Sequence, residues 1–264
     1  MMSFTVNDGA RIFWRESGNG PPLLLIMGLG YSSAMWCHVE AGLARHFRVI
    51  LFDNRGIGKS TAPPGPIRIA DLAADATAVL DAAEVDSAFV FGLSMGGFIA
   101  QELALGNPRR VRALVLGATN CGGSHFIQAK QEVRDLLVKR ADMPAEQSIR
   151  AMFPYIYDAS TPAGRLEADL ALRLANFPQA GVYLRQLEAI SQWQSCDRLS
   201  KLATPTLILH GENDLLVPSG NAELLQQHIP GSRMNLIPEA SHVFTTDKPA
   251  FTVQALGEFF LGQA

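Results

Sequence analysis

Short runs of apolar residues alternate along this chain with stretches that have the spacing of helices. Residues 23–27, Leu-Leu-Leu-Ile-Met, are continuously apolar, which is typical of a strand buried on both faces of a sheet. Further strands are expected at residues 47–52, 88–91, 111–116, 206–209 and 234–237, and helices at 32–44, 69–83, 95–105, 219–228 and from Pro249 onward. Strands that alternate with helices predict an α/β fold with a doubly wound, mostly parallel sheet.

The start of the chain is expected to be antiparallel. Residues 4–6 and 11–15 flank the segment Asn7-Asp8-Gly9-Ala10. Asn, Asp and Gly tolerate the positive φ that a tight hairpin turn needs, so this segment predicts a β-hairpin.

The alternation stops between residues 122 and 198, where no strand pattern is visible. Prolines at positions 144, 154, 162 and 178 divide this stretch into pieces, and Leu166, Leu170 and Leu174 share one helix face. We therefore expect an α/β core formed by residues 1–121 and 199–264, with residues 122–198 inserted as a helical cap.

The charge balance argues against polyanionic partners. The 264 residues include 22 Lys and Arg and 25 Asp and Glu, a formal net charge of −3, and no basic block. This predicts no nucleic-acid partner and no membrane partner. The longest apolar run, residues 23–31, is too short to cross a bilayer, and we expect no signal peptide because the first residues lack its charged and apolar regions.

Cysteine and histidine spacing predicts no metal site. The cysteines Cys37, Cys121 and Cys196 are odd in number and widely spaced, which indicates neither a disulfide framework nor a zinc pattern. We therefore expect reduced thiols and a cytoplasmic protein. His38, His46, His125 and His228 show no ligand spacing, and His210 is expected to be structural.

The segment Gly92-Leu93-Ser94-Met95-Gly96 lies between an expected strand and an expected helix. That is the context of a nucleophile elbow, a sharp turn that holds a serine oxygen clear of the backbone. The residues two before and two after the serine must be small, because strand and helix converge there, and both are glycine. The helix that follows directs its N-terminal amides at any negative charge formed beside Ser94.

Two further residues complete a candidate triad. Asp214 and His242 each follow an expected strand after the cap, and the order Ser94, Asp214, His242 is that of the α/β-hydrolase triad. His242 would act as general base and acid, and Asp214 would orient and stabilise its imidazole. Asp197 and Glu239 are alternative acids.

An oxyanion hole needs two amide donors. The segment Met27-Gly28-Leu29-Gly30 follows the first buried strand, so we expect the amides of Leu29 and Met95 to serve, with Gly28 allowing close approach to the substrate.

Two glycine-rich segments resemble nucleotide-binding loops but do not fit them. Residues 28–33 lack the third glycine of a dinucleotide fingerprint, and residues 53–60 have Asp53 where a phosphate loop needs its first glycine. No cofactor is expected.

The chain resembles the α/β-hydrolase superfamily, in its small bacterial esterase and lactonase branch near 3-oxoadipate enol-lactonases and aclacinomycin methylesterases. Residues 53–60, Asp-Asn-Arg-Gly-Ile-Gly-Lys-Ser, are similar to the family's D-x-R-G-x-G-x-S loop, and residues 210–214 to its H-G-x-x-D. The resemblance implies a helical cap over the triad and no cofactor. Many members have His-Gly where this chain has Met27-Gly28. Ser94 excludes the epoxide-hydrolase and haloalkane-dehalogenase chemistry of relatives with Asp there.

These features predict a serine hydrolase that cleaves a small carboxylic ester or lactone through an acyl-enzyme. Gly28, Trp36, Phe126, Trp193 and Val217 are the expected substrate contacts. A C–C bond hydrolase of the meta-cleavage-product type is an alternative, although Met27 to Tyr31 does not match its H-G-S-G-P-G loop. A ligand receptor that keeps the triad is another. A homodimer is compatible with the sequence, which does not decide the oligomeric state.

Overall fold

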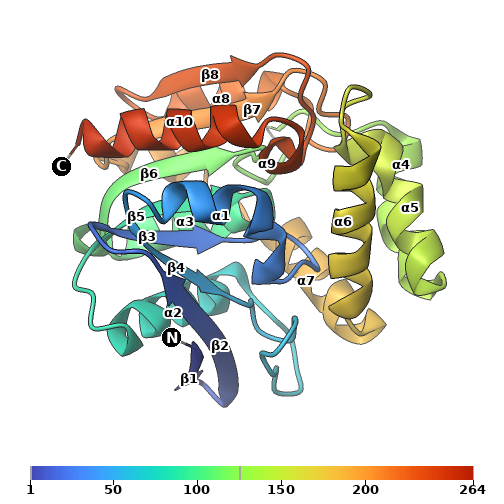
Figure 1. Cartoon of the computed structure of the whole chain (residues 1–264), viewed down its shortest axis with the longest axis horizontal. Helices are drawn as coiled ribbons and strands as arrows, with labels where there is room; N and C mark the ends of the chain where they lie inside the picture. Colours follow the sequence, from blue (N-terminus) through green and yellow to red (C-terminus); the bar gives the residue numbers. More distant parts are fainter. Residues whose placement is uncertain (1, 125, 264) are drawn as a thin grey trace.

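A computed structural model describes residues 2–124 and 126–263 and shows an eight-stranded, mostly parallel sheet (Figure 1). Its order is β1-β2-β4-β3-β5-β6-β7-β8, with only β1 and β2 antiparallel to their neighbours. The strands are β1 (Met2–Asn7), β2 (Ala10–Ser17), β3 (Pro22–Ile26), β4 (Arg48–Phe52), β5 (Ala88–Leu93), β6 (Val111–Gly117), β7 (Thr206–Gly211) and β8 (Arg233–Ile237). The expected doubly wound sheet is confirmed.

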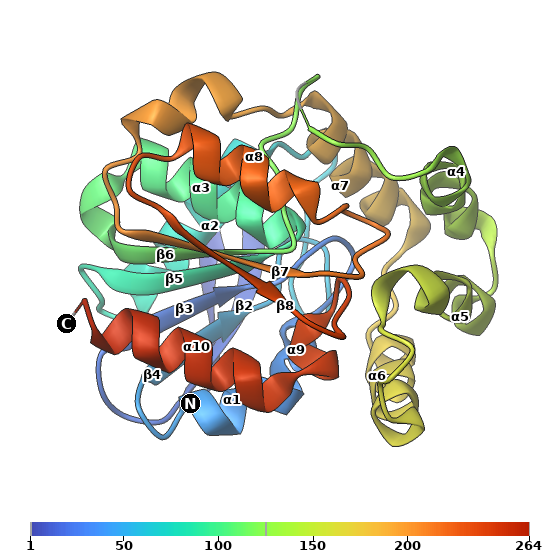
Figure 2. The same cartoon turned by 90° about the horizontal axis from the view of Figure 1, so that it is seen from above.

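Helices cover both faces of the sheet (Figure 2). On one face lie α2 (Ile69–Ala82), α3 (Met95–Gly106) and α8 (Gly220–His228), and on the other α1 (Cys37–Leu43), α9 (Phe244–Asp247) and α10 (Pro249–Leu261). Alternate residues of β3 point to opposite faces, so Leu24 and Ile26 join one buried cluster and Leu23 and Leu25 the other. This two-sided burial is why the strand is continuously apolar.

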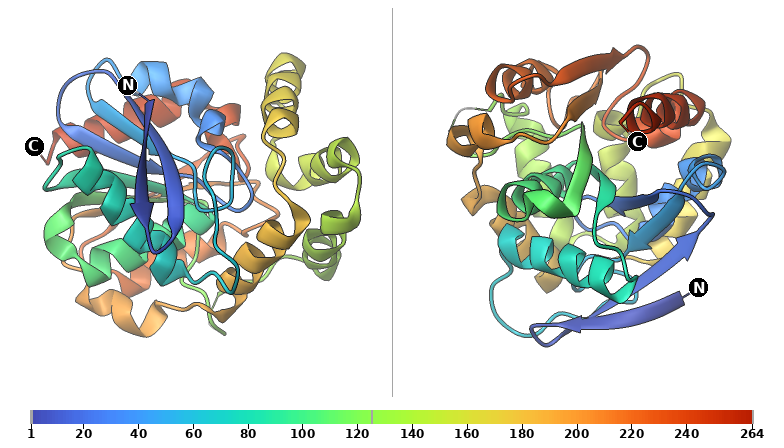
Figure 3. Two further views of the ribbon diagram at one scale, coloured as in Figure 1. Left: turned by 90° about the horizontal axis from the view of Figure 1, so that it is seen from below. Right: turned by 90° about the vertical axis from the view of Figure 1, so that its left-hand side faces the viewer.

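The antiparallel hairpin forms one edge of the sheet, opposite β8 (Figure 3). Asn7 pairs with Ala10, and the two residues between them, Asp8 and Gly9, have φ values of +44° and +72°. The turn therefore has the conformation that its Asn-Asp-Gly sequence predicts.

The segment between β6 and β7 is helical and lies beyond the ends of the strands (Figure 2). It contains α4 (Gln131–Lys139), α5 (Ala145–Ile156), α6 (Ala163–Ala175) and α7 (Ala180–Gln192), with short 3-10 turns η3 (Arg140–Asp142) and η4 (Cys196–Lys201). We call residues 122–198 the cap segment. Two further 3-10 turns, η1 (Ser33–Trp36) and η2 (Pro108–Arg110), precede α1 and β6.

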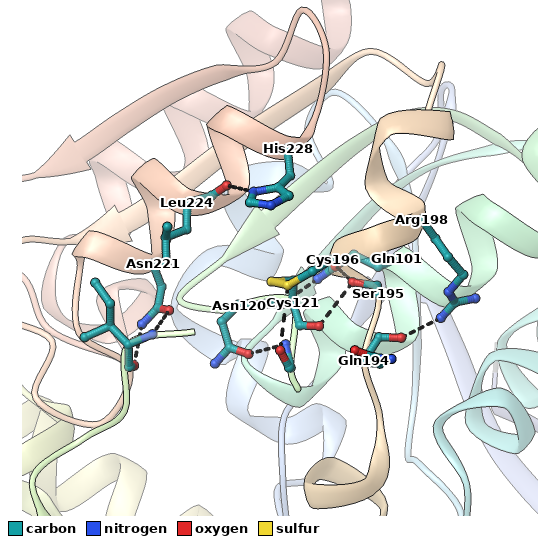
Figure 4. Close-up of a disulfide and its surroundings, with 12 residues drawn as sticks. Gln101, Asn120, Cys121, Gln194, Ser195, Cys196, Arg198, Asn221, Leu224 and His228 are labelled. Atoms are coloured by element: carbon teal, nitrogen blue, oxygen red, sulfur yellow. Dashed lines mark hydrogen bonds between the residues drawn. A yellow bond between two sulfur atoms is a disulfide. The ribbon is translucent and has the colours of Figure 1, made fainter. Parts of the chain in front are cut away.

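A disulfide joins Cys121 to Cys196 (Figure 4), which corrects the expectation of reduced thiols. Cys121 lies after β6, where the chain enters the cap segment, and Cys196 is the first residue of η4, near the point where the chain leaves it. The disulfide therefore joins the two ends of the cap segment. Their sequence separation of 75 residues made them look unrelated, but the cap returns the chain to the place where it left. Cys37 is free and exposed. The cysteines therefore no longer support the predicted cytoplasmic location, which stays a prediction.

Within the described residues, no helix combines the length and apolar character needed to cross a membrane.

Candidate active site

Ser94 occupies a strained turn between β5 and α3. Its φ is +58° and its ψ −123°, a region that residues with side chains rarely adopt. Side chains at Gly92 and Gly96 would overlap backbone atoms of Gly96 and Ile26, so both positions need glycine. The Ser94 amide donates to Gly117 O at 2.8 Å, and Thr119 Oγ1 donates to Ser94 O at 2.8 Å. These bonds hold the serine at the N-terminus of α3.

Asp214 and His242 are in direct contact. His242 Nδ1 lies 2.8 Å from Asp214 Oδ2, and both residues are buried. Because an ionised carboxylate only accepts hydrogen bonds, Nδ1 is the donor and Nε2 is left as the basic nitrogen. The structure thus places Asp214 against His242, while Asp197 is exposed and Glu239 is exposed and paired with Lys248 at 3.1 Å.

The Asp214 carboxylate is held ionised by several donors. Oδ1 accepts from the amides of Leu216 and Val217 at 2.9 and 2.8 Å, and His210 Nε2 lies 3.2 Å from Oδ2. Burial alone would raise the pKa of Asp214, but the imidazoles of His242 and His210 outweigh it and keep the pKa below its usual value. His210 also contacts Val217 O at 2.7 Å, so it supports the turn that carries Asp214.

The loop after β3 lies against the serine. A Cβ on Gly28 would stand 3.0 Å from Ser94 Cβ, which explains the glycine. Neither the Leu29 amide nor the Met95 amide has an acceptor among the described residues. Asn54 Nδ2 donates to Met27 O at 2.8 Å, and the Gly30 amide donates to Gln186 Oε1 at 3.1 Å. Gln186 lies on α7, and the sequence of that helix gave no indication that this side chain contacts the loop after β3.

A cavity of about 580 Å³ lies between the core and the cap segment. Ser94 and His242 both line it, together with Gly28, Leu29 and Met95. Most of the lining is apolar, including Met27, Leu93, Phe98, Met152, Leu187 and Ile190. Among the described residues, no hydrogen bond joins Ser94 Oγ to His242, and such bonds often tighten only when substrate is present.

The expected substrate contacts divide into two groups. Phe126 and Val217 line the cavity with Gly28. Trp36 does not: it is 0% exposed and packs against Phe91 with ring centroids 5.1 Å apart, so the expectation of a substrate contact was wrong. Trp193 does not line the cavity either, since it stacks behind Phe98 at 4.5 Å and its Nε1 donates to Glu102.

Other polar clusters are structural. Asp53, at the start of the 53–60 loop, accepts from the amides of Ser33 and Lys59 at 2.7 and 2.9 Å. A larger hollow of about 710 Å³ between α1 and α10 has no serine or cysteine among the described residues that line it. His125 lies outside the described residues.

Cys37, His38 and Asp169 place possible ligand atoms within 4.8 Å of one another. The Asp169 carboxylate already accepts from Tyr157 Oη at 2.8 Å and Thr246 Oγ1 at 2.7 Å, and it pairs with His38 at 2.8 Å. These bonds occupy the carboxylate, so the cluster serves as a hydrogen-bond network between α1, the cap segment and α9.

The sequence profile of a family described as alpha/beta hydrolase fold matches residues 21–249. The chain belongs to the α/β-hydrolase family. Among curated relatives, it is similar to a protein of Azorhizobium caulinodans named "Putative carbamate hydrolase RutD". The two are 33% identical over 265 residues, which cover 99% of this chain and 97% of that protein.

Solved α/β-hydrolase structures are also similar. The enol-lactonase from Burkholderia xenovorans LB400 has a TM-score of 0.87 and 26% identity, over 98% of this chain and 100% of that one. Esterase RhEst1 from Rhodococcus sp. ECU1013 has a TM-score of 0.86 and 27% identity, over 100% and 99% of the two chains. These relatives confirm the resemblance to small bacterial esterases and lactonases and support a hydrolytic role.

Proposed function

We propose that the protein is a serine hydrolase that cleaves a carboxylic ester or lactone through an acyl-enzyme on Ser94. The observation that carries this proposal is the contact between Asp214 and His242, because His242 lines the same cavity as Ser94. The strained backbone of Ser94 and the two unpaired amides beside it are independent support.

In the first half of the reaction, Ser94 Oγ attacks the carbonyl carbon while His242 Nε2 takes its proton. The oxyanion that forms accepts hydrogen bonds from the amides of Leu29 and Met95. Collapse of this intermediate breaks the ester C–O bond, and the proton on His242 passes to the leaving alkoxide. In the second half, water takes the place of Ser94 as the attacking group, and His242 removes a proton from it. The bond between Ser94 Oγ and the acyl carbon then breaks, His242 returns the proton to Ser94 Oγ, and the carboxylic acid is released.

The size and character of the cavity favour an ester or lactone with an apolar acyl part. A volume of about 580 Å³ is within the range of sites for drug-sized ligands, and the lining is mostly apolar. A carbamate, the substrate class in the name of the Azorhizobium caulinodans relative, is a small anion that would leave most of this space unfilled. A panel of esters and lactones of graded acyl size, with carbamate included, measures this preference.

A fluorophosphonate probe tests the nucleophile directly. Such a probe reacts with an activated serine, so we expect a single adduct on Ser94 in the folded protein and none in Ser94→Ala. Ser191 is the matched control, because it lines the same cavity but donates its hydroxyl to Glu188 O at 2.8 Å. Ser191→Ala should label like the unaltered protein. An adduct on another residue would remove Ser94 from the proposed role.

A further inference from the structure

A second, much smaller cavity lies beside the substrate cavity. It has a volume of about 10 Å³ and is lined by Gly30 and Tyr31 of the loop after β3 and by Arg140, Arg173 and Tyr183 of the cap segment. A volume of this size holds about one water-sized particle. The lining contains two arginines and no carboxylate among the described residues.

Both arginines are buried, and neither forms a salt bridge with any described residue. Arg140 is 7% exposed and Arg173 is 4% exposed. A buried charge without a partner of opposite charge is costly, because the low-dielectric interior does not replace the water that it has lost.

Neutral acceptors take up only some of the N–H donors of the two guanidinium groups. Arg173 donates to the hydroxyls of Tyr31 and Tyr157, and its carbon Cζ lies 4.4 Å from the Tyr31 ring centroid. Arg173 Nε is buried and has no hydrogen-bond partner among the described residues. Arg140 donates through Nε to Ser148 Oγ at 3.2 Å. Arg173, whose guanidinium keeps one buried donor without an acceptor among the described residues, is thus one of the residues that line the small cavity.

The nearest buried carboxylate in this network does not neutralise the arginines. Asp169 reaches Arg173 only through the Tyr157 hydroxyl, and it is itself paired with His38. Hydrogen bonds that His38 makes to Asp169 and Cys37 raise the pKa of His38 to about 10, so His38 is a cation at neutral pH and compensates Asp169. The two arginines are left as an excess of positive charge between the core and the cap segment.

We propose that this cavity binds one monovalent inorganic anion of halide size between the guanidinium groups of Arg140 and Arg173. The anion would supply the missing negative charge and join η3 and α6 of the cap segment to the loop that carries the Leu29 amide. This site is distinct from the substrate cavity, although Leu29, Tyr31 and Arg140 line both.

Thermal unfolding in sodium bromide and in sodium gluconate at equal ionic strength tests the proposal on the unaltered protein. Gluconate is too large for the cavity, so the Tm should rise saturably with bromide and stay constant with gluconate. Crystals grown in bromide should show an anomalous peak between Arg140 and Arg173. An unchanged Tm together with a water molecule, or an empty cavity, at that position would overturn the proposal.

Variants identify the residues. Arg173→Met keeps an unbranched chain in place of the aliphatic part of the side chain and removes its charge, so the saturable bromide response should disappear. Arg150→Met is the control, because Arg150 lies on the exposed face of α5. The alternative is that bromide binds where the carboxylate of a substrate binds in the substrate cavity. Competitive inhibition, with KM raised by bromide and kcat unchanged, would indicate that case and contradict a separate anion site.

Discussion

At the scale of single residues, the backbone of Ser94 is the least ordinary feature of the site. A non-glycine residue at φ +58° and ψ −123° costs on the order of 1–3 kcal/mol, which the surrounding hydrogen bonds and close packing must offset. The strain places the hydroxyl above the sheet and directly before the first turn of α3. A serine in a relaxed turn would not be held at the N-terminus of a helix and beside the cavity that His242 also lines.

Asp214→Asn should lower kcat by several orders of magnitude while the fold is retained. The amide nitrogen of Asn would donate where the carboxylate accepts, which favours the wrong tautomer of His242; the same change in a serine protease triad costs roughly 10⁴-fold. Steady-state kinetics with circular dichroism as a check on folding measures this. Glu239→Gln is the control and should keep its activity. Near-normal turnover of Asp214→Asn would assign the acid to another residue.

Motif and order predicted which residues the structure brings to the ends of the strands better than they predicted which residues line the cavity. Ser94, Asp214 and His242 were predictable because an elbow and two strand ends fix where their side chains can lie. Trp36 and Trp193 were not, since a large aromatic residue near the cavity packs equally well behind its wall. Arg173 and Gln186 left no local signal, because they contact the distant residues Tyr31 and Gly30 of the loop after β3.

At the scale of elements, the continuous apolar strands were predictable because burial on both faces leaves no polar position. Helix α9 was missed, since four residues are too few to show a helical period. The pairing of Cys121 with Cys196 was missed for a different reason. It depends on the cap segment returning to its starting point, which no local pattern records.

Loss of this disulfide should destabilise the protein. A cross-link over 75 residues restricts the unfolded chain, so Cys121→Ser or Cys196→Ser should lower the free energy of unfolding by about 2–4 kcal/mol in urea titrations. Cys37→Ser is the control and should have little effect, because Cys37 is free and exposed. Thiol titration of the denatured, unreduced protein should detect Cys37 alone. Reaction of all three cysteines before reduction would contradict the bond.

At the scale of the whole molecule, one polar network fastens the cap segment to the core. His38 on α1 pairs with Asp169 on α6, and the same carboxylate accepts from Tyr157 at the end of α5 and from Thr246 on α9. These bonds join four segments that are distant in the sequence. The position of the cap over the cavity therefore depends on a charged pair as well as on apolar packing.

The ionic state of His38 should make stability depend on pH. Hydrogen bonds that His38 makes to Asp169 and Cys37 raise its pKa in the folded protein to about 10, against roughly 6.5 when unfolded. Because the pKa of His38 is higher in the folded protein, protonation of His38 stabilises the folded state fully when the pH is below the pKa of the unfolded chain. This stabilisation is lost as the pH rises through about 10. Urea unfolding at pH 6, 8 and 10 should show a loss that His38→Asn lacks.

His46→Asn is the matched control, because His46 is an exposed histidine just beyond α1. It should keep the pH dependence of the unaltered protein. If His38→Asn and the unaltered protein lose the same stability between pH 6 and pH 10, the pair with Asp169 does not carry the effect.

Stopped-flow release of p-nitrophenol from esters of several acyl lengths tests the central claim most directly. If the acyl-enzyme forms and hydrolyses, the protein should release many equivalents of p-nitrophenol. When deacylation is the slower step, a burst equal to the enzyme concentration should come first, and esters with the same acyl chain but different leaving groups should have the same kcat. Ser94→Ala should lower turnover at least about a thousandfold. Turnover that survives Ser94→Ala, or one stoichiometric release with nothing after it on every ester and lactone, would contradict the account.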